Sequence, residues 1–193
     1  MPLGSAEALA LAGLMGAGKS TVAAHLGRLL GRRVVSTDEE VVRRAGKPVA
    51  RIFSEEGEAA FRELERGVVA SLAGPLVVDL GGGAFCDPAS AARLLATARV
   101  VFLDVSPAEA ARRISREGTD PGAGARPLAD RWAQLLAHRL PLYLRAHHTI
   151  RVDALTPEAV ARRIADLVLP RKGGGERFIA GERVLAEGGE GGG

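Results

Sequence analysis

Short apolar segments alternate along the chain with longer segments whose apolar residues have helical spacing. Five short segments are candidates for strands: residues 8–12, 34–35, 76–80, 100–105 and 149–152. They do not alternate between apolar and polar residues, which is typical of strands buried on both faces. Because helical segments separate them, we predict an α/β fold: a three-layer sandwich in which helices flank a central five-stranded parallel sheet.

Capping residues mark where two of the later helices begin. Ser106 precedes a proline and has Glu109 three positions later, so we expect a capping box there. Thr156 is likewise followed by a proline. We therefore expect helices to start directly after Ser106 and Thr156.

The end of the chain differs in composition from the rest. The last helix should run to about Leu169, because Pro170 cannot continue it. Residues 171–193 are dominated by glycine and hold too few apolar residues to pack. We expect one domain over residues 1–170 and a flexible glycine-rich tail over residues 171–193.

The composition fits a soluble globular protein. Apolar residues make up 47% and charged residues 25% of the 193 residues, which excludes collagen and wholesale disorder. The apolar segments are too short to cross a bilayer, and the single cysteine cannot form an internal disulfide. We therefore expect a cytoplasmic protein with no membrane partner. The net charge is +3, but the arginines are dispersed and aromatic residues make up only 4%, so we expect no nucleic-acid partner.

One loop carries a strong signature of nucleotide binding. Residues 13–20 fit the pattern G-x-x-x-x-G-K-S between a predicted strand and a predicted helix. Backbone N–H groups in such a loop converge on phosphate, and the helix adds the positive end of its dipole. We predict a nucleoside triphosphate as a substrate and Mg2+ as a cofactor, with Lys19 on the β and γ phosphates and Ser20 on the metal. The predicted nucleotide-binding residues here are Gly13, Gly16, Ala17, Gly18, Lys19, Ser20 and Thr21.

Residues after two other predicted strands are candidates for the acceptor side. Asp38 places a carboxylate at the carboxyl end of the second strand, where doubly wound sheets bind their ligands. Gly81, Gly82 and Gly83 follow the third strand, and consecutive glycines let the backbone approach a small ligand closely. A loop that binds a nucleoside triphosphate does not by itself identify the acceptor.

Over residues 9–169 the chain resembles the shikimate kinases, small members of the nucleoside monophosphate kinase-like P-loop fold. The resemblance rests on the order and spacing of several motifs besides the P-loop. These are Thr37-Asp38, Gly46-Lys47-Pro48, Ile52-Phe53, Gly57-Glu58, Phe61-Arg62, Glu65, Gly81-Gly82-Gly83, Arg126-Pro127-Leu128, Arg139 and Pro141-Leu142-Tyr143.

The resemblance implies phosphorylation of the 3-hydroxyl of shikimate by ATP. Asp38 then holds the acceptor hydroxyls, and Arg62 and Arg139 bind the substrate carboxylate, for which guanidinium forks are suited. Gly81–Gly83 complete the pocket floor. The resemblance also implies that the protein is a monomer.

The same resemblance implies a lid and an adenine site. Residues 115–126 have the composition of a mobile lid, and Arg126 matches a lid arginine that contacts the phosphates during transfer. Adenine is expected between the helix that carries Arg113 and the loop at 153–157. The predicted catalytic residues are Lys19, Asp38 and Arg126.

One position departs from the family pattern. The family has Asp-Thr-Asp or Asp-Ser-Asp after the second strand, and its first aspartate helps to hold magnesium. Here that residue is Ser36, whose neutral hydroxyl is a poorer partner for a hard cation. We hypothesise that Asp79, at the end of the third strand, takes over this role. The predicted metal residues are Ser20 and Asp79.

Two other functions are compatible with parts of the pattern. The chain could phosphorylate another small hydroxylated acceptor, such as gluconate or a nucleotide, although two arginines and a glycine triplet favour a small acid. Ser36 also motivates a nucleotide-binding module without turnover. Retention of Lys19, Asp38 and Arg126 argues against that alternative.

Overall fold

A parallel sheet of five strands forms the centre of the protein. The computed structural model describes residues 3–116 and 128–169, apart from the side chains of residues 128–131. The strand order in the described part is β2-β3-β1-β4-β5, and every neighbouring pair is parallel. The strands are β1 (Ala8–Ala12), β2 (Val34–Ser36), β3 (Val77–Asp79), β4 (Ala98–Asp104) and β5 (His148–Arg151). The predicted α/β fold is confirmed.

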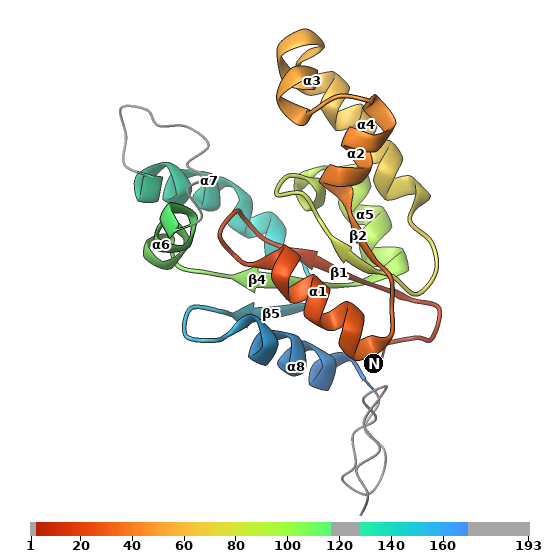
Figure 1. Cartoon of the computed structure of the whole chain (residues 1–193), viewed down its shortest axis with the longest axis vertical. Helices are drawn as coiled ribbons and strands as arrows, with labels where there is room; N and C mark the ends of the chain where they lie inside the picture. Colours follow the sequence, from red (N-terminus) through yellow and green to blue (C-terminus); the bar gives the residue numbers. More distant parts are fainter. Residues whose placement is uncertain (1–2, 117–127, 170–193) are drawn as a thin grey trace, which may run out of the picture.

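Helices cover both faces of the sheet. They are α1 (Lys19–Leu30), α2 (Thr37–Ala45), α3 (Val49–Glu55), α4 (Gly57–Ser71), α5 (Pro88–Thr97), α6 (Pro107–Arg116), α7 (Leu128–Tyr143) and α8 (Pro157–Val168), with a short 3-10 helix at Ala84–Cys86. The crossover from β1 runs toward β2 at one edge of the sheet, and the crossover from β3 runs toward β4 on the other side of β1. Because such crossovers are right-handed, α1 and α5 lie on opposite faces of the sheet. Helix α8 lies beside α1, and α5 packs on β4 (Figure 1).

The strands differ in burial according to their place in the sheet. All residues of β1 and β3 are buried, as expected for strands covered on both faces. The prediction of full burial was wrong for β2 and β5: Val34 is 39% exposed, and Thr149 is exposed. Both are edge strands, so each lacks a neighbour on one side.

The helix starts follow the predicted caps, with one difference. The Thr156 hydroxyl accepts from the Ala159 N–H at 3.2 Å, and the Ser106 hydroxyl accepts from the Glu109 N–H at 3.3 Å. The return half of the capping box at Ser106 is not formed. The Ser106 N–H donates instead to Asp153, and the Glu109 carboxylate accepts from two arginines one turn further along α6, where both partners are charged.

Helices α2, α3 and α4 form a second, smaller hydrophobic cluster. Val41, Ile52, Phe61 and Val68 are buried there, separate from the core around the sheet. Figure 1 shows α3, with the adjoining parts of α2 and α4, projecting from one end of the sheet. This unit carries Asp38 and Arg62 on the side predicted to bind the acceptor.

The last described helix ends as predicted. Helix α8 closes at Val168 with Leu169 as its C-cap. The predicted tail at 171–193, Arg126 and most of the predicted lid lie outside the described residues, so the division of the chain at residue 170 stays a prediction. Among the described helices, none has the length and apolar character needed to span a membrane.

Candidate active site

The loop at residues 13–18 joins β1 to α1 at the carboxyl end of the sheet. Gly16 has a φ of 77°, and a Cβ there would lie 2.9 Å from the Ala110 carbonyl oxygen of α6, so only glycine fits. Gly18 is the N-cap of α1, which places the positive end of that helix at the loop. The Ala17 N–H donates to the Leu14 carbonyl at 3.2 Å. The segment has the geometry of a phosphate-binding loop.

The charges of two carboxylates, those of Asp79 and Asp38, act on Lys19. The residue is half-buried, and its Nζ donates to the Leu14 carbonyl at 3.3 Å. Burial lowers the pKa of Lys19, while the charges of Asp79 and Asp38 act in the opposite direction. The structure thus brings together the predicted phosphate cation, the predicted acceptor carboxylate and the hypothesised metal carboxylate.

Asp79 is buried and faces the P-loop. Its Oδ2 accepts from the Ser20 hydroxyl at 2.6 Å, and the residue is only 7% exposed. Strand β3 lies directly beside β1, so the end of β3 is close to the loop that follows β1. Ser36 is the partner of Asp79 across β2 and β3, and its hydroxyl caps α2 by accepting from the Glu39 N–H. Asp79 therefore lies on the strand next to β1, whereas Ser36 lies one strand further from β1.

Asp38 lies in the first turn of α2, where the residue is partly exposed and its carboxylate lies against Gly81. Desolvation raises its pKa, and so does the charge of Asp79, against the opposing effects of Lys19 and Arg62. The preceding residue, Thr37, is fully buried, and its hydroxyl accepts from the Gly81 N–H at 2.7 Å. This hydrogen bond fixes the start of α2 against the glycine triplet.

Each glycine of the triplet lies against a different acceptor-side residue. A Cβ on Gly81 would overlap the Asp38 carboxylate, and a Cβ on Gly83 would overlap the Arg62 guanidinium. A Cβ on Gly82 would lie 3.6 Å from Arg139 Nη1. From the sequence, the glycines are expected to let a ligand approach the backbone. The structure shows that they also leave room for the side chains of Asp38, Arg62 and Arg139.

The two arginines on the acceptor side are held differently. Arg62 is paired with Glu58 at 3.1 Å and with the buried carboxylate of Glu65 at 2.7 Å. Arg139 donates from Nη1 to the Gly82 carbonyl at 3.0 Å and has no carboxylate partner within the described part of the chain. A substrate carboxylate would complete the charge balance of Arg139.

Arg113 connects the P-loop to the loop after β5. Its Nη2 donates to the Val152 carbonyl at 2.8 Å, and its Nη1 donates to the Gly16 carbonyl at 3.4 Å. Glu109 accepts from its Nε at 2.7 Å. Arg113 thus lies on the first segment expected to line the adenine site, and it bonds to the residue that precedes the second segment, the loop at 153–157.

Three residues in or beside the site form contacts beyond those predicted from the sequence. Glu65 is 1% exposed and holds Arg62, and its place three residues after Arg62 on one helix is the only local signal for this pair. Trp132 donates from Nε1 to the Met15 carbonyl of the P-loop at 2.9 Å, and Tyr143 donates to the Gly82 carbonyl. Their partners are distant in the chain, so no spacing could reveal them.

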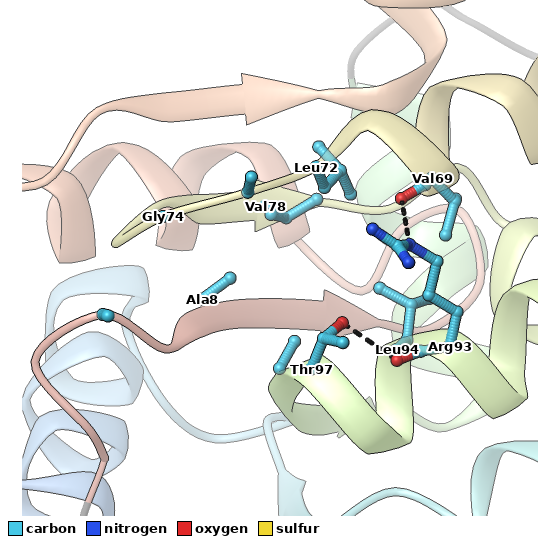
Figure 2. A pocket seen from close by; sticks show the side chains of 11 residues that line it. Ala8, Val69, Leu72, Gly74, Val78, Arg93, Leu94 and Thr97 are labelled. Carbon is cyan, nitrogen blue, oxygen red and sulfur yellow. Dashed lines mark hydrogen bonds between the residues drawn. The ribbon is translucent and has the colours of Figure 1, made fainter.

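A cavity of about 260 Å³ lies at the amino-terminal ends of β1 and β3, away from these residues. Figure 2 shows its apolar lining, which includes Val69, Leu72, Val78 and Leu94. Arg93 reaches across it and donates to the Val69 carbonyl at 3.3 Å. The cavity contains none of the predicted site residues.

A family model described as Shikimate kinase matches residues 15–168. The chain belongs to the shikimate kinase family. A shikimate kinase from Thermobifida fusca is 47% identical over 158 residues, covering 80% of this chain and 91% of the relative. A shikimate kinase from Mycobacterium leprae is 37% identical and covers 90% of each chain.

Solved structures of shikimate kinases have the same fold. The shikimate kinase from Acinetobacter baumannii in complex with shikimate aligns with a TM-score of 0.79 at 33% identity, covering 85% of this chain and 93% of that one. The shikimate kinase from Bacteroides thetaiotaomicron aligns with a TM-score of 0.77 at 31% identity, covering 83% and 97%. As a member of the shikimate kinase family, the chain is an ATP-dependent small-molecule kinase.

Proposed function

We propose that the protein transfers the γ-phosphoryl group of ATP to the 3-hydroxyl of shikimate, giving shikimate 3-phosphate and ADP. One observation carries this proposal: the glycine triplet lies against Asp38, Arg62 and Arg139, while the charge of Lys19 in the P-loop acts on Asp38. A carboxylate and two guanidinium groups beside a phosphate-binding loop suit an acceptor that is both an alcohol and an acid.

The reaction forms a bond between the acceptor oxygen and the γ phosphorus and breaks the bond to the β-γ bridging oxygen. Asp38 orients the attacking hydroxyl and accepts its proton. Lys19 and the amino end of α1 stabilise the negative charge on the phosphate oxygens. Arg62 and Arg139 bind the carboxylate and so hold the reacting hydroxyl at Asp38. Arg113 is proposed to contact adenine.

The residues around Ser20 fit a magnesium ion. Mg2+ prefers oxygen ligands and is usually held in proteins by one or two side chains, with water and phosphate completing its shell. Ser20 and Asp79 offer a hydroxyl and a carboxylate 2.6 Å apart beside the P-loop. When bound there, the ion would neutralise charge on the β and γ phosphates. We therefore assign Ser20 as a ligand and Asp79 as the carboxylate that holds the ion directly or through water.

Arg126 is proposed to close over the transferring phosphoryl group as part of the lid at 115–126. It lies outside the described residues, so this role rests on the family pattern alone. The monomeric state, the cytoplasmic location and the lack of nucleic-acid or membrane partners stay predictions.

The proposal is tested by ADP release from the purified protein with ATP and Mg2+, with and without shikimate. We expect release that requires shikimate and is lost in Asp38→Asn. Release with gluconate or a nucleotide but not with shikimate would overturn the proposed acceptor. ATP binding without release for any acceptor would favour the nucleotide-binding module.

A further inference from the structure

Tyr143, the last residue of α7, reaches the glycine triplet from the core. The residue is 1% exposed, and its ring stacks on Phe102 of β4 with the ring centroids 4.9 Å apart and the planes at 15°. Its hydroxyl donates to the Gly82 carbonyl at 2.5 Å. The ring is therefore fixed by packing, and the hydroxyl is directed at one backbone atom of the acceptor pocket.

Tyr143 and Arg139 share the same acceptor. Arg139 lies one helical turn earlier on α7, and its Nη1 donates to the Gly82 carbonyl at 3.0 Å. A carbonyl oxygen has two lone pairs, so it can accept both hydrogen bonds at once. Because Arg139 has no carboxylate partner in the described structure, the hydrogen bond to the Gly82 carbonyl orients its guanidinium group.

The phenol keeps its proton, so it remains a donor. Burial raises the pKa of Tyr143 well above its ordinary value, against the opposing charge of Arg139. The neighbouring Cys86 thiol also interacts with the phenol, and burial raises the pKa of that thiol as well. Both groups are neutral at physiological pH.

We propose that the Tyr143 hydroxyl is a positioning group for the acceptor pocket: it holds the Gly82 carbonyl where Arg139 is aligned for the substrate carboxylate. The inference rests on the proposed function, since Arg139 must bind an acid. Because Tyr143 is buried, it acts on the acceptor through Gly82 and Arg139. Loss of the Tyr143 hydroxyl shifts Gly82 and frees the Arg139 side chain. This weakens binding of the acceptor but not binding of ATP.

The variant Tyr143→Phe keeps the stacked ring and removes only the hydroxyl. We expect the KM for shikimate to rise about three- to tenfold, as for the loss of one buried hydrogen bond, with the KM for ATP and kcat at saturating shikimate unchanged. Cys86→Ala is the matched control, because it removes the neighbouring thiol but leaves the phenol bonded to Gly82. It should leave both KM values unchanged.

A double-variant cycle separates positioning from general stability. In an Arg139→Ala background, Tyr143→Phe should have little further effect on the KM for shikimate, because the residue it positions is absent. An unchanged KM for shikimate in Tyr143→Phe, equal rises in both KM values, or full additivity with Arg139→Ala would overturn the inference.

A readout without substrate distinguishes failure of this inference from failure of the proposed function. The Arg139 Nε–H resonance, assigned by its loss in Arg139→Lys, should be sharp in the parent protein and broadened or shifted in Tyr143→Phe. An unchanged resonance would overturn the positioning role even if the parent protein did not phosphorylate shikimate.

Discussion

The Ser20 hydroxyl donates to the Asp79 carboxylate with 2.6 Å between Oγ and Oδ2, which joins the first turn of α1 to the end of β3. Asp79 is also the neighbour of Ser36 across β3 and β2, and Ser36 stands at the position where the resemblance to shikimate kinases implies an aspartate. Strand β3 is adjacent to β1, whereas β2 is at the edge of the sheet. A carboxylate on β3 is thus close enough to hold the metal ion proposed at Ser20.

Asp79→Ala should therefore raise the Mg2+ concentration required for half-maximal rate. We expect an increase of about tenfold or more, as is typical when a carboxylate that supports a metal ion is removed. The measurement is the initial rate against free Mg2+ at saturating ATP and shikimate. An unchanged Mg2+ requirement would exclude Asp79 from the metal site.

The second variant restores a carboxylate at the neighbouring position. Ser36→Asp in the Asp79→Ala background should recover much of the lost Mg2+ affinity. Aspartate is as good an N-cap as serine, so the start of α2 should be preserved. If the double variant required as much Mg2+ for half-maximal rate as Asp79→Ala, a carboxylate at residue 36 would not replace one at residue 79.

Glu65→Gln should weaken shikimate binding through Arg62. The Glu65 carboxylate is buried and lies 2.7 Å from Arg62 Nη1, and without its charge Arg62 is left with the exposed Glu58. We expect the KM for shikimate to rise about tenfold, as for the loss of a hydrogen bond between charged groups. Glu58→Gln, at an exposed helical pair, is the control and should change the KM less than about twofold. Equal effects of the two variants would contradict the assignment.

Gly81→Ala should lower kcat because the new methyl group would overlap the Asp38 carboxylate. A displacement of about 1 Å at the group that orients the nucleophile costs on the order of a hundredfold in rate. Gly67→Ala, in the interior of α4, is the control: its methyl group meets only Arg44 Nη1 at 3.8 Å. The control should keep full activity and be slightly more stable, since alanine favours helix. Full activity of Gly81→Ala would show that the triplet tolerates a side chain.

The acid limb of the pH profile should reflect Asp38. Desolvation and Asp79 raise the pKa of Asp38 above its ordinary value of 3.8, so the ionised form that accepts the proton is lost earlier as the pH falls. The limb of kcat/KM for shikimate should have its midpoint above pH 3.8. Circular dichroism at each pH verifies that the protein remains folded. A midpoint at or below 3.8 would contradict the raised pKa.

The same shift has a consequence for stability. A carboxyl group whose pKa is raised by folding destabilises the folded protein once the pH exceeds that pKa. Asp38→Asn should therefore raise Tm at pH 7 while abolishing turnover. A lower Tm in this variant would mean that the ionised carboxylate stabilises the fold.

Much of this architecture is predictable from the sequence because its signals are local. The uninterrupted apolar segments indicate a parallel sheet, and residues 13–20 indicate the phosphate loop together with its flanking strand and helix. Thr156 likewise marks the start of α8 through its own side chain. The exposure of β2 and β5 depends on strand order, which no local pattern contains.

The contacts that organise the candidate site are non-local. Thr37 accepts from Gly81, Tyr143 donates to Gly82, and Trp132 donates to Met15, across 44, 61 and 117 positions of the chain. Only the fold brings these pairs together. At Glu109 the sequence indicates a cap, but nearby arginines bind its carboxylate instead.

The position of the transferred phosphate tests the central claim most directly. The purified protein is incubated with ATP, Mg2+ and shikimate, and the product is examined by phosphorus and proton NMR, with Asp38→Asn as the control. The account predicts a phosphate monoester coupled to the proton on C3 of shikimate, formed in step with ADP and absent in the variant. A phosphate on another oxygen, or ADP formed without a phosphorylated acceptor, would contradict it.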